Sequence, residues 1–207
     1  IDEEWVNLYE DLAYGKCPKG LFMIGYCLNS SNKKSPLKYN FEEKTVQAVC
    51  TQLQMLNQES FTEQGIRLDF TDLTSNMSFR CRPHQLVRTL QGLIINAKEA
   101  TTGSENPEIK LKIFREGMTL IFQVQDNGRG IPMDLRHRIF EPFFSTKSFQ
   151  TGQGLTLAIS KGLIEAQGGQ MRYQPLPRGS CFAIRLALEP PSSTGASDEY
   201  VKTLAAP

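Results

Sequence analysis

The architecture follows from residues 108–132, EIKLKIFREGMTLIFQVQDNGRGIP. Apolar residues alternate with polar ones over 108–115 and recur over 118–126, which predicts two strands. The Glu-Gly pair between them is short enough for a tight hairpin turn. DNGRGIP follows the second strand directly, and its two glycines allow the backbone to turn sharply or to approach a ligand closely. We therefore expect a β-hairpin that presents an aspartate at the end of a strand.

Helices and further strands flank this hairpin. After Pro83, leucines recur at helical spacing, which predicts a helix with one broad buried face. A second helix begins near Gly154 and ends at the Gly168-Gly169 pair, as a left-handed cap would end it. The remaining predicted elements are a helix over 41–60 and strands over 66–70, 77–81, 170–174 and 180–188. This order indicates an α+β fold in which a mixed sheet is covered on one face by helices.

Length and composition allow one sizeable core, since the chain has 207 residues, 40% of them hydrophobic, and a formal net charge of +1. That charge supplies no global field for nucleic acid or an anionic membrane, and the longest apolar run, Leu21 to Leu28, is too short to span a bilayer. We expect an N-terminal segment and linker over 1–37, a regular domain over 38–188 and a loose tail over 189–207. Five scattered cysteines without CxxC spacing indicate reduced thiols and a cytoplasmic location.

Three features of the regular domain could carry chemistry, and each also has a plain structural interpretation. Asp126 could accept a hydrogen bond from an amino group, or DNGRGIP could be an ordinary turn. GQGLTLA, at 152–158, leads into a helix whose free N–H groups suit a phosphate, or it is a hinge. Asn96 lies at the edge of an apolar helix face, where its amide oxygen could serve Mg²⁺ or satisfy a structural hydrogen bond.

A series of motifs in register resembles a known family. The motifs are LIINAKEA (93–100), DNGRGIP (126–132), IFEPFFSTK (139–147), GQGLTLAISKGLIEAQGG (152–169) and GSCFAIRL (179–186). They resemble the ATP-binding catalytic domain of sensor histidine kinases, within the superfamily shared with gyrase, the MutL repair proteins and the large heat-shock chaperones. NAKEA with FEPFFSTK is most similar to the nitrogen-regulation type of kinase. The resemblance implies a two-layer α/β sandwich of the Bergerat type with an ATP lid.

The resemblance also implies roles for individual residues. Asn96 matches the magnesium-binding asparagine, and Asp126 matches the aspartate that accepts from the adenine amino group. Phe140, Phe143 and Phe144 match the aromatic box that hinges the lid, although packing in the core is an open alternative for each of them. The implied ATP-binding residues are Asn96, Asp126, Gly128, Gly130, Ile131, Phe140, Lys147, Gly152, Gly154, Leu155 and Ser180. ATP and Mg²⁺ are therefore the implied cofactors.

The sequence departs from the family pattern at several positions. Gly92 stands one helical turn before Asn96, where relatives place asparagine or a water-activating glutamate, and glycine can do neither job. Glu99 replaces a common lysine, and Thr156 and Gln150 replace glycines. The expected consequences are slow ATP hydrolysis and a lid that is stiffer or binds more weakly.

The chain has two histidines, His84 and His137, and neither lies in the motif that carries the family's phosphorylated histidine. In the family, that histidine lies on a dimerisation hairpin ahead of the ATP-binding domain. We expect this chain to be a fragment, or the product of a degenerate gene, in which residues 1–37 are a remnant of the hairpin. The implied partners are a histidine-bearing hairpin, with a homodimer in the full-length protein, and the receiver domain of a response regulator.

The leading hypothesis is the ATP-binding part of a two-component sensor histidine kinase, which transfers the γ-phosphoryl group of ATP to a histidine outside this segment. The alternative favoured by Gly92, Glu99 and Thr156 is a nucleotide-binding pseudokinase or scaffold. A serine-directed kinase and anti-sigma factor fits less well with FEPFFSTK and the long lid, and a mismatch-repair or topoisomerase ATPase lacks its glutamate at Gly92. No contact of this segment with nucleic acid or a membrane is expected, and the full-length protein could be membrane-anchored.

Overall fold

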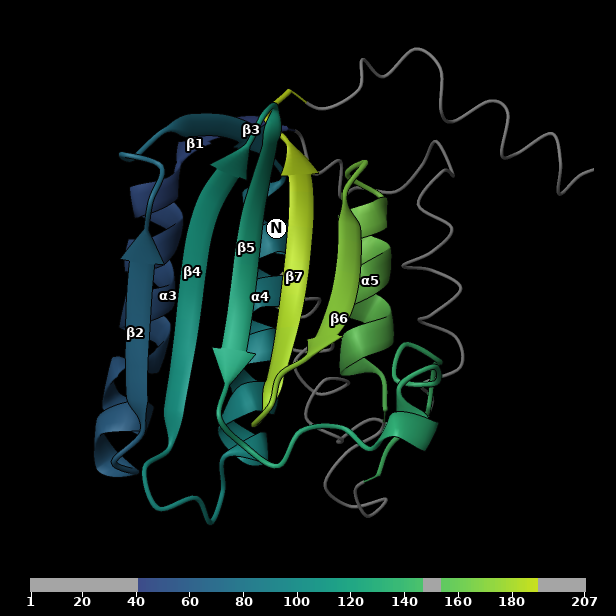
Figure 1. Cartoon of the computed structure of the whole chain (residues 1–207). Helices are drawn as coiled ribbons and strands as arrows, with labels where there is room; N and C mark the ends of the chain where they lie inside the picture. The colour runs from purple at the N-terminus through teal and green to yellow at the C-terminus, as the bar shows by residue number, and fades with distance from the viewer. Residues whose placement is uncertain (1–40, 147–153, 190–207) are drawn as a thin grey trace, which may run out of the picture.

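A five-stranded mixed sheet, covered on one face by helices, forms the body of the structure (Figure 1). This computed structural model describes residues 41–146 and 154–189. The elements run in the order β1 (Glu42–Thr45), α3 (Val46–Glu63), β2 (Arg67–Asp72), β3 (Ser78–Cys81), α4 (Pro83–Ala100), β4 (Glu108–Glu116), β5 (Thr119–Asp126), η1 (Met133–Leu135), α5 (Thr156–Glu165), β6 (Gln170–Pro175) and β7 (Ser180–Ala187).

The strand order in the sheet is β2-β4-β5-β7-β6. β2 pairs with β4 in parallel, and the other neighbours are antiparallel. Helices α3, α4 and α5 all lie on the same side of this sheet, behind it in Figure 1. β4 and β5 form the predicted hairpin, which turns at Gly117 with a φ of 58°. The predicted two-layer sandwich with a mixed sheet and one helical face is therefore confirmed.

The predicted helix over 41–60 is wrong at its start, because its first residues form strand β1. β1 pairs antiparallel with β3, and Thr45 lies opposite Ser78. The Thr45 hydroxyl then caps α3 by accepting a hydrogen bond from the Ala48 N–H at 3.2 Å. The helical spacing from Val46 onward was correct, but it was extended backward across this cap.

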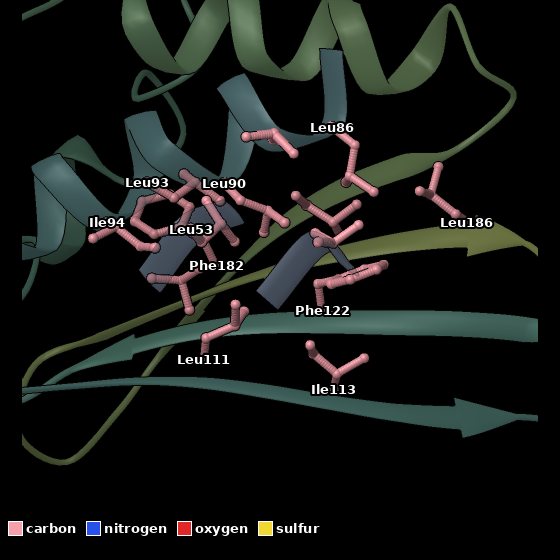
Figure 2. Packing of buried hydrophobic residues seen from close by; sticks show 14 of the residues in the cluster. Leu53, Leu86, Leu90, Leu93, Ile94, Leu111, Ile113, Phe122, Phe182 and Leu186 are labelled. Carbon is pink, nitrogen blue, oxygen red and sulfur yellow. The ribbon is translucent and has the colours of Figure 1, made fainter. Parts of the chain in front are cut away.

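Helix α4 anchors the core against the middle of the sheet. Figure 2 shows Leu86, Leu90, Leu93 and Ile94 of α4 packed toward the strand residues Leu111, Ile113, Phe122 and Phe182. All four α4 side chains are completely inaccessible to solvent. Burying each of them contributes about 1.5–3 kcal/mol relative to leaving it exposed. The helix that carries Asn96 is therefore held rigidly on the sheet.

Two expectations from the composition concern the cysteines and the membrane. Cys50, Cys81 and Cys181 are buried free thiols, as the scattered spacing predicted; the other two cysteines lie outside the described residues. Burial raises the pKa of the Cys50 and Cys181 thiols to about 11 and that of Cys81 to about 12. Over 41–146 and 154–189, no helix combines the length and hydropathy needed to cross a bilayer.

Candidate nucleotide-binding site

Asp126 ends strand β5 as a deeply buried carboxylate, 5% exposed. Its Oδ1 accepts a hydrogen bond from the Gly128 N–H at 2.9 Å, and it lies opposite Ser180 in the pairing of β5 with β7. Burial raises the pKa of Asp126, and hydrogen bonds from the backbone N–H groups of Gly128 and Ser180 oppose that rise. A carboxylate offers about four acceptor positions, so capacity remains for an amino group of a ligand.

The DNGRG turn packs closely against the C-terminal end of α4. A β-carbon at Gly128 would lie 2.3 Å from the carbonyl oxygen of Ala100, so only glycine fits there. The same oxygen accepts the Arg129 N–H at 3.1 Å. The close approach of α4 is thus by itself enough to require glycine at position 128.

Asn127 ties this turn to the loop before β4, and the sequence analysis did not single it out. Its Oδ1 accepts the Glu108 N–H at 2.9 Å, and its Nδ2 donates to the Asn106 carbonyl at 2.7 Å. Asparagine after a strand and before glycine was the available signal, since its side chain often bonds nearby backbone groups.

Gly179 is a second residue of this region that was not among the ATP-binding residues predicted from the sequence. It has a φ of +88°, and a β-carbon there would lie 1.9 Å from the carbonyl oxygen of Asp126. Gly130 has a φ of +69°, and a β-carbon at Gly130 would lie 3.2 Å from the carbonyl oxygen of Gly179. Two glycine backbones therefore meet beside the buried carboxylate. The signal was the glycine directly before Ser180.

Asn96 is half-buried on α4, one helical turn before Ala100. Four residues of helix correspond to roughly 6 Å along the axis, so Asn96 lies close to the turn that Ala100 contacts. Its side-chain amide forms no hydrogen bond to any residue that the structure describes. A half-buried amide with no hydrogen-bond partner among the described residues fits a role as a ligand for Mg²⁺, which takes few protein ligands beside phosphate oxygens.

The N-terminus of α5 is the predicted phosphate-binding end. Leu155 precedes the helix, is buried, and provides no side-chain cap for the first N–H groups. Gly154 has a φ of +66°, and its β-carbon would lie 2.5 Å from the Phe143 backbone. Gly154 is thus packed against the aromatic segment. Lys147 and Gly152, the other two predicted phosphate contacts, lie outside the described residues.

The aromatic box has different structural environments at its three positions. Phe140 packs edge-on against Phe182, with ring centroids 6.4 Å apart. The guanidinium carbon of Arg138 lies 4.4 Å from the centroid of the Phe144 ring. Phe143 is 55% exposed and has a φ of 65°, which is unusual for a phenylalanine. Phe140 and Phe144 are partly buried and pack against the core, which fits the core alternative, whereas Phe143 of these three presents its ring to solvent.

The predicted residues thus gather in two neighbouring groups. Asp126, Gly128, Gly130 and Ser180 meet where β5 ends and β7 begins. Ile131 follows directly and packs on the edge of the core. Asn96 lies one turn back along α4, and α4 contacts α5, which begins after Gly154 and Leu155. The arrangement offers a buried acceptor at one end and, at the other, a helix N-terminus and an amide that have no side-chain partner among the described residues.

A family model and relatives of known identity match this arrangement. Residues 81–190 match the model described as "Histidine kinase-, DNA gyrase B-, and HSP90-like ATPase". The two-component sensor PprA of Pseudomonas aeruginosa is 32% identical over 142 residues, which is 66% of this chain and 15% of PprA.

Solved histidine kinases share the fold. The catalytic domain of the histidine kinase ThkA superposes with a TM-score of 0.66 at 27% identity, covering 73% of this chain and 97% of that domain. Full-length ShkA in complex with AMPPNP gives a TM-score of 0.65 at 25% identity, covering 75% of this chain and 33% of ShkA.

This chain belongs to the histidine kinase-, DNA gyrase B- and HSP90-like ATPase family, since the family model covers more than half of it. The sensor kinases that it matches are much longer, and the chain spans only about 15–20% of the length of PprA, DctB of Rhizobium meliloti and AtoS of Escherichia coli. The shared part is the ATPase-type domain, and the family's fold agrees with the architecture in Figure 1.

Proposed function

We propose that this chain is the ATP-binding kinase part of a two-component sensor histidine kinase, with its nucleotide-binding unit within residues 38–188. The observation that most supports this proposal is the buried Asp126 beside the Gly128–Gly130 turn, because its carboxylate can accept further hydrogen bonds. Burying a carboxylate is costly for stability, and a role in recognising an adenine amino group would explain why an aspartate is buried here. The likeness to ShkA, which was solved with AMPPNP, supports the same assignment.

The region around Asp126 and the Gly128–Gly130 turn would be the base pocket, which holds the adenine. From there the triphosphate would extend toward Asn96 and the start of α5. Asn96 would hold Mg²⁺ through its amide oxygen, and the first N–H groups of α5 would donate to phosphate oxygens. Bound Mg²⁺ supplies neutralisation of the charge on the phosphate oxygens. The protein contributes position and hydrogen bonds, which are the main requirements of phosphoryl transfer.

The acceptor of the phosphoryl group would be a histidine supplied by another segment or partner. His84 and His137 are both exposed, and neither is among the residues grouped around Asp126 or Asn96. From the phosphohistidine, the group would pass to an aspartate of a response regulator, as the two-component name of PprA suggests. A homodimer of the full-length protein would bring the acceptor hairpin to this domain.

Calorimetry with AMPPNP, with and without Mg²⁺, tests nucleotide binding. Asp126→Asn should abolish binding with or without the metal, whereas Asn96→Ala should abolish only the contribution of Mg²⁺. Unchanged affinity in the Asp126 variant would exclude the adenine assignment. Arg172→Gln, on exposed strand β6, is the matched control.

Transfer itself requires a second assay. The chain is mixed with [γ-³²P]ATP and a separately supplied histidine-bearing hairpin from a related kinase, and acid-labile, base-stable phosphate is measured on the hairpin. Nucleotide binding without transfer to any hairpin would favour the pseudokinase or scaffold function. Phosphate on His84 or His137 of this chain would contradict an external acceptor.

A further inference from the structure

A cavity of about 360 Å³ opens at the end of the sheet where β5 terminates and the β6–β7 turn lies, the lower end in Figure 1. Two chain segments form it: 128–132, joined by Arg136, and 176–179. Its size falls within the range of roughly 300–1,000 Å³ that small-molecule sites occupy. The cavity is therefore large enough for a compact metabolite.

Three arginines, Arg129, Arg136 and Arg178, line this cavity, and no acidic residue does. None of the three forms an ion pair with any residue over 41–146 and 154–189. Three arginines elsewhere on the described surface are ion-paired, Arg67, Arg138 and Arg185, whereas Arg115 and Arg172 form hydrogen bonds but no ion pair there. The cavity thus concentrates positive charge that the described protein does not neutralise.

Arg136 is held in place, which separates it from an ordinary mobile surface arginine. Its Nε donates to the Ile131 carbonyl at 3.0 Å, and its guanidinium lies 5.9 Å from the centre of the Tyr173 ring. The remaining N–H groups of the guanidinium stay available. A fixed guanidinium loses less conformational entropy when it binds an anion, and its fork matches two oxygens of a phosphate.

The cavity is distinct from the proposed triphosphate site. Its lining includes neither Asn96 nor any residue of α5, and Asp126 is also absent from it. It shares Gly128, Gly130, Ile131 and Gly179 with the proposed base pocket beside Asp126. The arginines therefore have no assigned ligand in the proposed nucleotide complex.

We propose that this arginine cavity binds a small phosphorylated molecule at a second site, separate from the ATP phosphates. The volume of this open hollow suits a small molecule, and three arginines that form no ion pair over 41–146 and 154–189 favour phosphate over a neutral or singly charged ligand. The site itself does not depend on kinase activity. Its link to the proposed function is the set of residues that both sites share, Gly128, Gly130, Ile131 and Gly179.

Inorganic pyrophosphate, without Mg²⁺, is the probe for this site, and its binding is followed by amide chemical shifts of the ¹⁵N-labelled chain. The expected result is saturable shifts at 129–136 and 176–179. Arg178→Gln should weaken binding by roughly tenfold, the loss of one charge-assisted hydrogen-bonding group, and Arg136→Gln by at least as much. Arg172→Gln, an exposed arginine hydrogen-bonded to Gln170, should leave the affinity unchanged.

Three outcomes would overturn the proposal: shifts confined to the start of α5, equal affinity in Arg178→Gln and wild type, or binding of an oligoglutamate peptide without binding of pyrophosphate. Arg178 lies in an exposed turn, so its variant keeps the test valid if Arg136→Gln disturbs the fold. AMPPNP affinity is measured on the same samples. Because the two ligands are measured independently, failure of ATP binding and failure of the second site are distinguishable.

Discussion

Gly92 of α4 packs directly against Thr156, the first residue of α5: a β-carbon at Gly92 would lie 3.0 Å from Thr156 Cγ2. The same β-carbon would lie 3.7 Å from Oγ of Ser160. The two departures from the family pattern at these positions therefore belong to one contact. α4 lacks a side chain where α5 carries one. A larger residue at position 92 requires Thr156 or α5 to move.

The first prediction concerns this contact. Alanine is favoured over glycine within a helix by about 1 kcal/mol, but in Gly92→Ala the contact with Thr156 should offset most of that gain. In the double variant Gly92→Ala/Thr156→Ala the gain should appear, with a coupling free energy of about 0.5–1 kcal/mol. Urea denaturation of the wild type, both single variants and the double variant gives the free energies of unfolding from which this coupling free energy is calculated. Additive effects would show that the two side-chain positions do not compete for space.

The second prediction compares two glycines with positive φ. Gly117 has a φ of +58° and nothing within 4 Å of its virtual β-carbon, so Gly117→Ala should cost only the strain of about 1–2 kcal/mol. Gly179 combines a φ of +88° with a 1.9 Å clash against the Asp126 carbonyl, so Gly179→Ala should cost more than about 3 kcal/mol.

Thermal and urea denaturation of both variants give these free energies, and AMPPNP titration reports on the site. Gly179→Ala should also weaken nucleotide binding wherever it still folds, because it displaces the backbone of Asp126. Gly117→Ala lies at the far end of the hairpin and should leave the affinity unchanged. Equal costs for the two variants would contradict the close contact.

The third prediction concerns a buried amide pair between α3 and α4. Nδ2 of Asn57 donates to Oε1 of Gln91 at 2.7 Å, and Nε2 of Gln91 donates to Oδ1 of Asn57 at 3.0 Å. Asn57 is only 2% exposed, so Asn57→Ala should lower the free energy of unfolding by about 1–3 kcal/mol.

The matched control for this pair is Gln54→Ala on the exposed face of α3, which should change stability by less than about 0.5 kcal/mol. The double variant Asn57→Leu/Gln91→Leu should recover part of the loss, since replacing both partners leaves no unpaired amide. Chemical denaturation measures all three. A loss in Asn57→Ala no larger than that of the control would refute the role of the pair.

The fourth prediction is a pH dependence that originates at Asp126. Burial holds its folded-state pKa above the ordinary value of 3.8, so the folded chain binds this proton more tightly than the unfolded chain. The wild type should therefore lose stability relative to Asp126→Asn as the pH rises above 3.8. At neutral pH the variant should be at least as stable as wild type, yet should not bind AMPPNP.

Urea denaturation of both proteins across the acidic to neutral range tests the sign. The wild type's affinity for AMPPNP should also fall when acid protonates Asp126, because a protonated carboxyl loses acceptor capacity. A stability difference that does not vary with pH would mean that burial leaves the carboxyl unperturbed.

Much of the fold could be predicted because its signals are local. Alternation over β4 and β5 and the leucine spacing after Pro83 each appear within a single element, and both were confirmed. The start of α3 was missed because helical spacing continued back through the residues that pair with β3. Strand pairing is a contact between distant segments, which periodicity within one segment does not report.

For the site, the sequence alone identified residue types and their order: a carboxylate after a strand, glycine-rich turns and an amide on an apolar helix. Only the tertiary structure explains why particular residue types are required at particular positions. Gly128 is glycine because the Ala100 carbonyl occupies its side-chain space, and Gly179 because Asp126 does. Tertiary structure also places Gly92 against the Thr156 side chain, in a less severe contact, and brings three arginines from two separate segments to one cavity. Periodicity and turn chemistry act over a few neighbouring residues, whereas steric exclusion and charge concentration arise only where distant segments pack.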